Sequence, residues 1–326
     1  MHPLRLVSYT SGANLPILPG KNTFHSSELF RLYEATEGYA PLLLVAYRKN
    51  KPVAKMLATR ISSTYLFGYP LYHRLEIYDT GEYFEEEQRE ATFQEMLTYL
   101  TQELNTTSNV IEFRNLSNGL WGYGSFRKNH YFPIDWLRIR NSVHSPKWQD
   151  RISNARKRQI QKGLRKGATI EEAKNLEEIL AFYKMLKHNY SAKWMKYFPN
   201  ISFFMAYYQM EEVKPLFRTF LVKYKGKIIG GSVCVYSDNE MAVLFSSGLS
   251  KRYYTVYPGV LAVWGILKQA KEEHISHVEF MNVGLPFRKN PYRNFIFQFG
   301  GKQTSTRRWF RFRWKFFNKL AEKIYV

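Results

Sequence analysis

Apolar runs joined by short basic turns recur along the chain and predict β-hairpins. Residues 43–60 read LLVAYRKNKPVAKMLATR, and residues 220–236 read FLVKYKGKIIGGSVCVY. Each segment has an apolar β-rich run, a polar turn and a second β-rich run, which is the pattern of two antiparallel strands. About half of the chain separates the two segments, so we expect one structural unit to occur twice.

Apolar residues at helical spacing follow each hairpin and lead into a further strand. Residues 84–104 carry such a stripe and precede VIEFRN at 110–115, while residues 259–274 precede HVEFMN at 277–282. A third match, in the same order, pairs the FRKN that begins at Phe126 with the FRKN that begins at Phe287. Three matches in one order favour an internal duplication.

The opening elements of the two halves also agree in kind. A strand at 4–9 precedes a helix from Ser26 to about Thr36, and a strand at 169–173 precedes a helix over 175–188. Asn175 has Glu178 three residues later, the spacing of a helix-capping box. The predicted fold class is therefore α/β (α+β), with two tandem domains that each have a central mixed sheet flanked by helices.

Composition shifts suggest where the domains divide. Residues 141–148 read NSVHSPKW, which is typical of a linker, so we expect domains at 1–145 and 146–305. Residues 306–326 alternate and then show helical spacing, which predicts a basic-aromatic helix that packs back on the N-terminal domain. A membrane-surface helix is the alternative, because Lys and Arg combined with Trp and Phe are typical of interfacial helices.

Overall composition is that of a globular protein with many aromatic residues. The 326 residues include 24 Tyr, 24 Phe and 7 Trp, which suits large cores and clefts that stack on ligands. The single cysteine, Cys234, lies in an apolar run and is expected to be a buried thiol. No apolar run approaches transmembrane length, and the first residues lack the layout of a signal peptide, so a cytoplasmic location is predicted.

Positive charge is concentrated in two stretches. The net charge is +21, and residues 147–166 and 302–326 each carry eight Lys or Arg against one acidic residue. Such a field attracts the phosphates of nucleic acid, nucleotide-sugar, cofactor or anionic lipid. A solvated surface that keeps the protein soluble is the simpler interpretation. Guanidinium groups on the predicted helix at 150–167 suit bidentate phosphate binding.

Several other kinds of chemistry find no support in the sequence. The eight histidines form no HExxH or similar spacing, so no metal site is expected, and GxSxG and phosphate-binding glycine loops are absent. Residues 250–264 offer Lys251 and Arg252 but only one glycine, Gly259, so no backbone cradle for a pyrophosphate is evident there.

In its motif order, the chain resembles the FemA/FemB/FemX-type peptidyltransferases and the wider BioF2-like group. The motifs are SNARKRQIQKGLRKGATI, FYKMLKHNYSAKW, FLVKYKGKIIGGSV, YYTVYPGVLAVWGILKQAKE and FIFQFGG, and they extend the resemblance over nearly the whole chain. The resemblance implies a tandem GNAT fold. It also implies that a substrate amine attacks an activated acyl carbonyl directly, with acyl-CoA or aminoacyl-tRNA as donor and no metal.

The same resemblance points to a catalytic region near residues 295–302. Fem-type enzymes read approximately Phe-Lys-x-x-Phe-Gly there, whereas this chain has Ile296 at the lysine position. Gln298, Lys302 or Arg293 are the candidates to replace that lysine. Glu279 is a candidate general base at a strand end, and pairing with a neighbouring arginine is the alternative for it.

The candidate site residues fall into three groups. The catalytic candidates are Glu279, Asn282, Gln298 and Lys302; the anion-binding candidates are Arg151, Arg156, Arg158, Lys193, Arg252 and Arg293; the cleft aromatics are Tyr254, Tyr257, Phe295 and Phe299.

Three functions remain open from the sequence. The first is a Fem-like acyl or aminoacyl transferase acting on an amine of a cell-envelope precursor, polysaccharide or lipid. The second is an acetyl-CoA-dependent N-acetyltransferase, and the third is a non-catalytic protein on a GNAT frame that binds RNA or a membrane surface. The expected partners are an anionic or nucleotide-linked precursor, with tRNA and a peripheral contact at the inner membrane face as further expectations.

Overall fold

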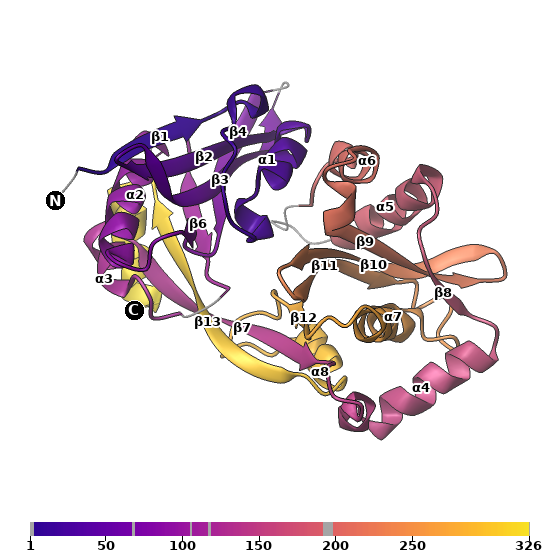
Figure 1. Ribbon diagram of the computed structural model, residues 1–326. Coiled ribbons are helices and arrows are strands. Elements are labelled where there is room, and N and C mark those ends of the chain that lie inside the picture. Colours follow the sequence, from indigo (N-terminus) through magenta and orange to yellow (C-terminus); the bar gives the residue numbers. More distant parts are fainter. Residues whose placement is uncertain (1–2, 67–68, 105, 117–118, 192–197, 326) are drawn as a thin grey trace. The chain divides into compact units, whose positions relative to one another are not determined.

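The computed structural model describes residues 3–66, 69–104, 106–116, 119–191 and 198–325. The chain divides into two compact units, shown in Figure 1. Unit 1 comprises Met1–Trp136 and Ser305–Val326, and unit 2 comprises Leu137–Thr304. The boundaries lie within two strands, since β7 (Phe132–Ser142) begins in unit 1 and ends in unit 2, and β13 (Lys302–Phe312) runs from unit 2 into unit 1.

Unit 1 is built on a mixed sheet in the order β1-β2-β3-β4-β6-β13. Neighbouring strands are antiparallel except for β4 and β6, which are parallel. Its other elements are β1 (Arg5–Tyr9), α1 (Ser27–Glu34), β2 (Tyr39–Arg48), β3 (Lys51–Leu66), β4 (Tyr69–Tyr78), β5 (Glu82–Tyr83), α2 (Arg89–Leu104), β6 (Val110–Arg114), α3 (Tyr123–Lys128) and α9 (Lys315–Tyr325), with short 3-10 turns at Gly12–Asn14 and Thr23–His25.

Aromatic residues fill the core of unit 1. Phe126 stacks on Trp309 with ring centroids 4.5 Å apart, and Phe113 meets Phe126 edge-on at 5.1 Å. Phe93 of α2 packs against the same group. Trp309 comes from β13, so the end of the chain completes the core of the unit in which the chain begins.

Unit 2 repeats the same strand order, β8-β9-β10-β11-β12-β7, and again one pair, β11 with β12, is parallel. Its elements are α4 (Asn154–Arg165), β8 (Thr169–Glu172), α5 (Leu176–Ser191), α6 (Ile201–Gln209), β9 (Phe217–Tyr224), β10 (Lys227–Ser237), β11 (Glu240–Gly248), α7 (Pro258–Glu272), β12 (His277–Phe280) and α8 (Pro291–Phe297), with 3-10 turns at Trp148–Arg151 and Lys214–Leu216.

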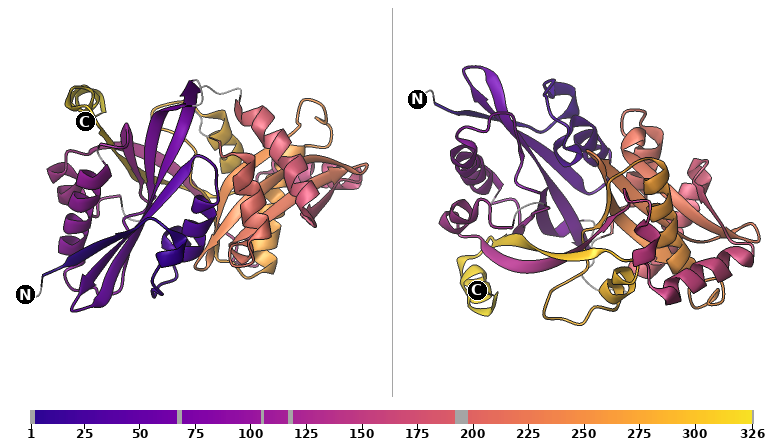
Figure 2. Two further views of the ribbon diagram at one scale, coloured as in Figure 1. Left: turned by 90° about the horizontal axis from the view of Figure 1, so that it is seen from above. Right: turned by 60° about the horizontal axis from the view of Figure 1, so that its bottom comes forward.

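Two adjacent glycines of β10 let helices approach both faces of this sheet, as Figure 2 shows for unit 2. A Cβ on Gly230 would lie 3.1 Å from the carbonyl oxygen of Pro258 at the start of α7. A Cβ on Gly231 would lie 3.0 Å from the ring of Phe182 in α5. Because neighbouring residues of a strand point to opposite faces, α5 and α7 cover opposite sides of the sheet.

The matching sheets confirm the predicted fold class of two tandem α/β domains. The hairpin, helix and strand matches of the sequence correspond to equivalent elements in the two units. The third match, between the FRKN segments at Phe126 and Phe287, was wrong because it aligned residues at different places in the two units. Phe126 lies in α3, whereas Phe287 precedes α8, so the two FRKN segments are not equivalent.

The helix cap predicted at Asn175 is confirmed, because it depends only on residues next to it in the sequence. The side chain of Asn175 accepts a hydrogen bond from the backbone N–H of Glu178 at 2.9 Å. The basic helix α4 buries only a narrow side. Ile160 and Gly163 are the buried positions, while Leu164 is 41% exposed, because only one narrow side of α4 packs against α7.

Two segments differ from their predicted structure. The expected linker at 141–148 begins inside β7, and its Trp148 is buried against Trp264 with ring centroids 5.3 Å apart. The C-terminal residues 306–312 belong to β13, so the predicted helix is limited to α9. The alternating Trp and Phe positions of 309–312 reflect the two faces of a strand.

Candidate functional site

Strand β11 extends beyond its parallel partner. It pairs with β12 only from Glu240 to Ala242, although β11 continues to Gly248. Over the described residues, the β12 side of positions 243–248 therefore has no strand partner, and we call this segment the open edge of β11. The backbone of Ser246 already forms a hydrogen bond with the hydroxyl of Tyr190. Other backbone groups at such an edge can pair with a ligand.

A β-bulge lies at the start of the open edge. Val233 of β10 faces Phe245, whereas the next residue, Cys234, faces Val243, so Leu244 is left out of the ladder. A bulged residue does not use its backbone groups in the regular strand pairing. The open edge thus begins with an N–H group that the pairing with β10 does not occupy.

Unit 1 has neither feature at the equivalent place. β4 pairs with β6 over five residues, from Arg74 with Val110 to Tyr78 with Arg114, which is the end of both strands. The backbone N–H of Asp79 then donates to the carbonyl oxygen of Arg114 at 2.8 Å and extends the closure. The described pairs of β3 with β4 show no register shift, so no β-bulge lies among them. The candidate site is therefore in unit 2.

The N-terminus of α7 lies beside the end of the open edge. A Cβ on Gly248 would lie only 2.5 Å from the backbone nitrogen of Gly259, so the strand and the helix meet through their backbones. Tyr257 precedes the helix in the left-handed region (φ 56°), and within the described residues its side chain makes no capping hydrogen bond. Pro258 has no N–H, and the N–H of Val260 donates to the carbonyl oxygen of Tyr257 at 3.0 Å. This helix end therefore offers an anion the N–H of Gly259 and the helix dipole.

Two cationic side chains of α4, Arg156 and Lys162, lie near this helix end. The guanidinium of Arg156 lies 4.4 Å from the centre of the Phe295 ring and 5.7 Å from that of Phe299. The ring of Phe295 in turn lies 3.9 Å from the position of a Cβ on Gly259. Burial lowers the pKa of Arg156, but a guanidinium stays charged at neutral pH. A half-buried positive charge therefore lies one aromatic ring away from the α7 N-terminus.

Arg156, Phe295 and Phe299 form a group around the N-terminus of α7, and Tyr257 belongs to it as well. The ammonium of Lys162 lies 5.9 Å from its ring centre. α4 can come this close because Gly163 has no side chain, and a Cβ there would lie 2.5 Å from the carbonyl oxygen of Val256. Of the candidates predicted from sequence, the structure thus brings together Arg156, Tyr257, Phe295 and Phe299.

Two more candidates lie close to this group without adding a free side chain to it. Gln298 contributes a backbone contact, and the side chain of Arg151 already has a hydrogen-bond partner. The carbonyl oxygen of Gln298 accepts from the N–H of Ser153 at 2.9 Å, which joins the end of α8 to the start of α4, and the Gln298 side chain is exposed. Arg151 packs against Gly300 and donates to the carbonyl oxygen of Ser142 at 2.7 Å.

Glu279 has a structural partner. Its carboxylate is buried and lies 2.7 Å from the guanidinium of Arg138, the alternative that the sequence left open for it. Arg293 is likewise engaged, since it donates to the carbonyl oxygens of Leu285 and Arg288 at 2.7 and 2.8 Å. Neither side chain extends free into the group around α7.

Among the described residues, no contact joins five further candidates to this group. Asn282, Lys302, Arg158, Arg252 and Tyr254 are exposed to solvent, and Lys193 lies outside the described residues.

Sequence reasoning missed the backbone features of the site. The residue type of Leu244 does not indicate a bulge. A bulge arises from a change of register between two strands, which a single residue does not reveal. Gly248 was not singled out, although its position directly after a β-rich run was visible. A glycine is needed at position 248 because the backbone of α7 packs directly against it, and α7 begins ten residues further along the chain.

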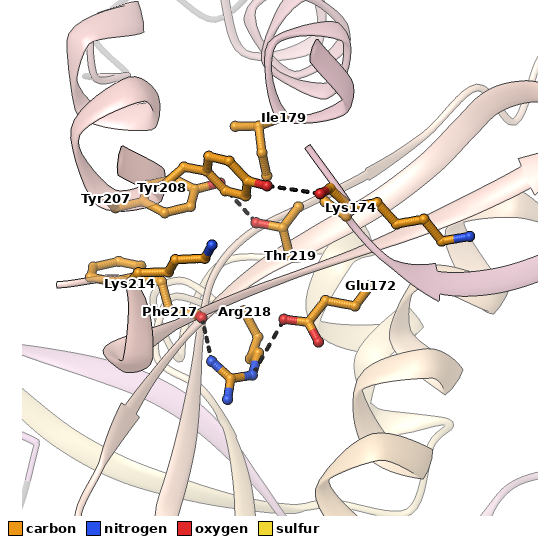
Figure 3. A pocket seen from close by; sticks show the side chains of 10 residues that line it. Glu172, Lys174, Ile179, Tyr207, Tyr208, Lys214, Phe217, Arg218 and Thr219 are labelled. Carbon is orange, nitrogen blue, oxygen red and sulfur yellow. Dashed lines mark hydrogen bonds and ion pairs between the residues drawn. The ribbon is translucent and has the colours of Figure 1, made fainter. Parts of the chain in front are cut away.

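A separate pocket of unit 2 lies between β8, β9 and α6 (Figure 3). Its polar groups largely bind one another. The hydroxyl groups of Tyr207 and Thr219 lie 2.8 Å apart, Tyr208 donates to the carbonyl oxygen of Lys174 at 2.9 Å, and Arg218 lies 3.4 Å from Glu172. This pocket shares no lining residue with the group around α7, and we assign it no role in catalysis.

The single cysteine of the chain is not placed as a nucleophile. Cys234 is fully buried in β10, and burial raises the pKa of its thiol far above the usual range. A buried neutral thiol is a poor nucleophile. Within the described ranges, no cluster of three or more His, Cys, Asp or Glu could hold a metal ion.

Comparison with known proteins agrees with this geometry. Residues 153–289, which lie in unit 2, match the family model described as acetyltransferase (GNAT) domain. None of the curated proteins searched matches the chain.

Solved structures resemble the whole chain. The structure of FemX has a TM-score of 0.64 at 9% identity, over 93% of this chain and 94% of that one. A tandem GNAT protein from the clavulanic acid biosynthesis pathway has a TM-score of 0.58 at 8% identity, over 96% and 99% of the two chains. L-PGS from Bacillus licheniformis has a TM-score of 0.57 at 11% identity, over 92% and 91%.

The chain is therefore a tandem GNAT-fold protein. Its resemblance to the FemA/FemB/FemX-type proteins is confirmed at the level of the fold. Across the described residues, no helix combines the length and apolar character that a bilayer crossing requires.

Proposed function

We propose that unit 2 transfers an acyl group from a phosphate-bearing carrier to an amine. One observation carries the proposal. The open edge of β11, with its bulge at Leu244, lies next to the uncapped N-terminus of α7 in unit 2, while the equivalent strands of unit 1 stay paired to their ends. The match of residues 153–289 to a GNAT acetyltransferase domain supports the same unit.

The reaction needs an acyl carbonyl to be held beside backbone donors. The amine nitrogen attacks the carbonyl carbon, a C–N bond forms, and the C–S bond of a thioester or the C–O bond of an ester breaks. The proton of the amine passes through solvent to the departing thiolate or alkoxide. The N–H of Leu244, which lies outside the regular pairing with β10, would stabilise the negative oxygen of the tetrahedral intermediate, which is the role of an oxyanion hole. This route uses no covalent enzyme intermediate.

Carrier phosphates would bind where α7 begins. The helix N-terminus, Arg156 and Lys162 together offer donors and positive charge. Acyl-CoA and aminoacyl-tRNA both carry phosphates, so the site suits either donor. We propose as acceptor the amine of an anionic or nucleotide-linked cell-envelope precursor, polysaccharide or lipid, on the basis of the FemX-like fold and the net charge of +21.

A thermal-shift panel with acetyl-CoA, CoA, total tRNA and UDP-N-acetylmuramyl peptides tests this function. A ligand at a hundredfold excess over its dissociation constant should stabilise the protein by about 2.7 kcal/mol. The Arg156→Gln variant should lose most of the shift with the donor. The matched variant Lys227→Gln, which removes an exposed charge at the start of β10, should keep it.

The identity of the stabilising ligand also separates the donors. A shift with acetyl-CoA and CoA would assign an acyl-CoA donor, and a shift with tRNA alone would assign an aminoacyl-tRNA donor. If no donor shifts the unfolding temperature, or if Arg156→Gln responds like the parent protein, the proposed site is wrong. A protein that only binds RNA or another polyanion would then be the better interpretation.

A further inference from the structure

The C-terminal helix α9 contacts unit 1 through a polar side. Asn318 is buried; its side-chain amide donates to the carbonyl oxygen of His130 at 2.7 Å and its oxygen accepts from the N–H of Phe312 at 3.0 Å. Ala321 is buried as well, and Glu322 lies 3.4 Å from Arg127. These positions are three or four residues apart, so they form one side of the helix.

Large apolar residues of α9 face the solvent instead. Phe316 is 72% exposed, Leu320 46% and Ile324 66%, and these residues are spaced four apart on one stripe. Phe317, 51% exposed, lies beside them. An ordinary surface helix buries its apolar stripe and exposes its polar one. α9 does the reverse, and Figure 2 shows it in yellow at the outside of unit 1 in both views.

Positive charge lies next to the apolar stripe. Lys315, Lys319 and Lys323 are exposed and each precedes one residue of the stripe by one position, so they form a parallel row. Arg313 and the half-exposed Trp314 come directly before the helix. The one acidic residue of α9, Glu322, is paired with Arg127 and leaves the lysine row unopposed.

We propose that α9 docks unit 1 on the surface of an anionic lipid bilayer. An apolar stripe bordered by Lys, with Trp and Phe among its residues, matches a helix that lies in the plane of the interface. Phe316, Leu320 and Ile324 enter the boundary of the acyl chains, while the lysines meet the phosphates of the headgroups. A protein partner would need acidic groups in a matching row, whereas an anionic bilayer offers them at every position. The inference is independent of the acyl-transfer site, which lies in unit 2.

Vesicle flotation with the full chain tests the docking. The protein should float with vesicles of phosphatidylcholine mixed with phosphatidylglycerol and bind vesicles of phosphatidylcholine alone much more weakly. Binding should weaken as salt rises from about 0.1 M to about 0.5 M, because exposed charges are screened. The triple variant Phe316→Ser/Leu320→Ser/Ile324→Ser should bind at least about tenfold more weakly, with little change in the unfolding temperature, since these three side chains are largely exposed.

Matched variants separate α9 from general surface effects. Ile17→Ser/Leu120→Ser removes exposed apolar residues elsewhere in unit 1 and should bind vesicles like the parent protein. Lys315→Gln/Lys319→Gln/Lys323→Gln should lose the preference for phosphatidylglycerol, and Lys49→Gln/Lys51→Gln/Lys128→Gln should retain it.

Three outcomes would overturn the docking. The triple apolar variant could float as well as the parent, or the parent could bind neutral and anionic vesicles alike at every salt concentration. The parent could also ignore vesicles and instead self-associate in a way that the triple variant abolishes, which would assign the apolar stripe to contact between copies of the chain.

Discussion

Glu112 of β6 and Glu279 of β12 occupy equivalent positions in the two sheets, and each carboxylate meets an arginine from the same relative place. Arg308 lies 2.9 Å from Glu112, and Arg138 lies 2.7 Å from Glu279. In both units the arginine stands on the antiparallel neighbour, two residues away from the position directly opposite the glutamate. The duplication thus extends to a buried ion pair.

The surroundings of the two pairs differ. In unit 1, Glu112 also lies 2.9 Å from Arg114, and Glu76 of β4 is directly opposite it. Burial alone would raise the pKa of Glu112, but the surrounding arginines outweigh it and lower that pKa. In unit 2, Ala242 stands opposite Glu279. The ionic cluster of unit 1 joins β4 to β6, whereas in unit 2 Ala242 of β11 offers Glu279 no charge, so the Arg138–Glu279 ion pair does not tie β11 to β12.

Breaking the pair in unit 2 should destabilise the protein strongly. Arg138→Met leaves a buried carboxylate without its partner, for which we expect a loss of about 3–5 kcal/mol in the free energy of unfolding. The double variant Arg138→Met/Glu279→Leu should recover most of that loss. Arg140→Met is the control, because Arg140 pairs with Glu240 at a more exposed place, and its loss should be under about 1 kcal/mol. Urea unfolding measures these three variants and the single variant Glu279→Leu, and a double variant as unstable as the sum of Arg138→Met and Glu279→Leu would refute the coupling.

Glu279 should not act as the general base of acyl transfer. A general base contributes about 10²–10⁴-fold to the rate, whereas we expect Glu279→Gln to lower the rate of transfer by less than about tenfold. The reason is that its carboxylate is buried against Arg138. The pH dependence of kcat/KM should keep its shape in this variant. Disappearance of a limb of that profile, with the fold intact, would return Glu279 to the catalytic residues.

Gly248 and Gly259 should respond very differently to alanine. A Cβ on Gly248 would meet backbone atoms of Pro258 and Gly259 at 2.5–2.9 Å, so Gly248→Ala should lower the free energy of unfolding by at least about 1–3 kcal/mol. A Cβ on Gly259 would have its nearest neighbour at 3.6 Å, and Gly259→Ala should change stability by less than about 1 kcal/mol. Urea denaturation of both variants checks the contact between β11 and α7. Equal effects would mean that the strand and the helix do not meet as described.

His25 should make the protein less stable in mild acid. Burial, with a contribution from the charge of Lys55, lowers the pKa of His25 from 6.5 to about 3. Above pH 6.5 His25 is neutral in both the folded and the unfolded chain and adds no pH dependence. Between pH 6.5 and about 3 only the unfolded chain takes up the proton, so stability falls by about 1.4 kcal/mol per pH unit as the pH decreases.

The comparison of two variants isolates this effect. His25→Gln keeps a side-chain acceptor for the N–H of Leu57, which lies 3.1 Å from His25, and should flatten the pH dependence between pH 6 and pH 4, a range below the unfolded pKa. His188→Gln, at an exposed position of α5, should leave it unchanged. Parallel curves for the parent protein and His25→Gln would show that His25 is protonated in the folded chain.

The sequence by itself determined what depends on near neighbours along the chain. The hairpins at 43–60 and 220–236, the N-cap at Asn175 and the duplicated order of elements follow from residue periodicity and turn chemistry, which act over a few residues. Arg156, Tyr257, Phe295 and Phe299 could be named from charge, aromatic character and a family resemblance, but not placed beside one another.

Only the tertiary structure decided the rest, because it depends on registers between strands and on side chains far apart in sequence. The open edge of β11 requires the end point of its pairing with β12, and the bulge at Leu244 requires the register against β10. The ion pair of Glu279 with Arg138 could not be predicted from the sequence, because almost half of the chain separates the two residues. The apolar stripe of α9 is visible as a pattern in the sequence, but its exposure follows from the burial of Asn318 on the other side of the helix. Local pattern specifies which element forms, and packing decides which of its faces meets solvent or ligand.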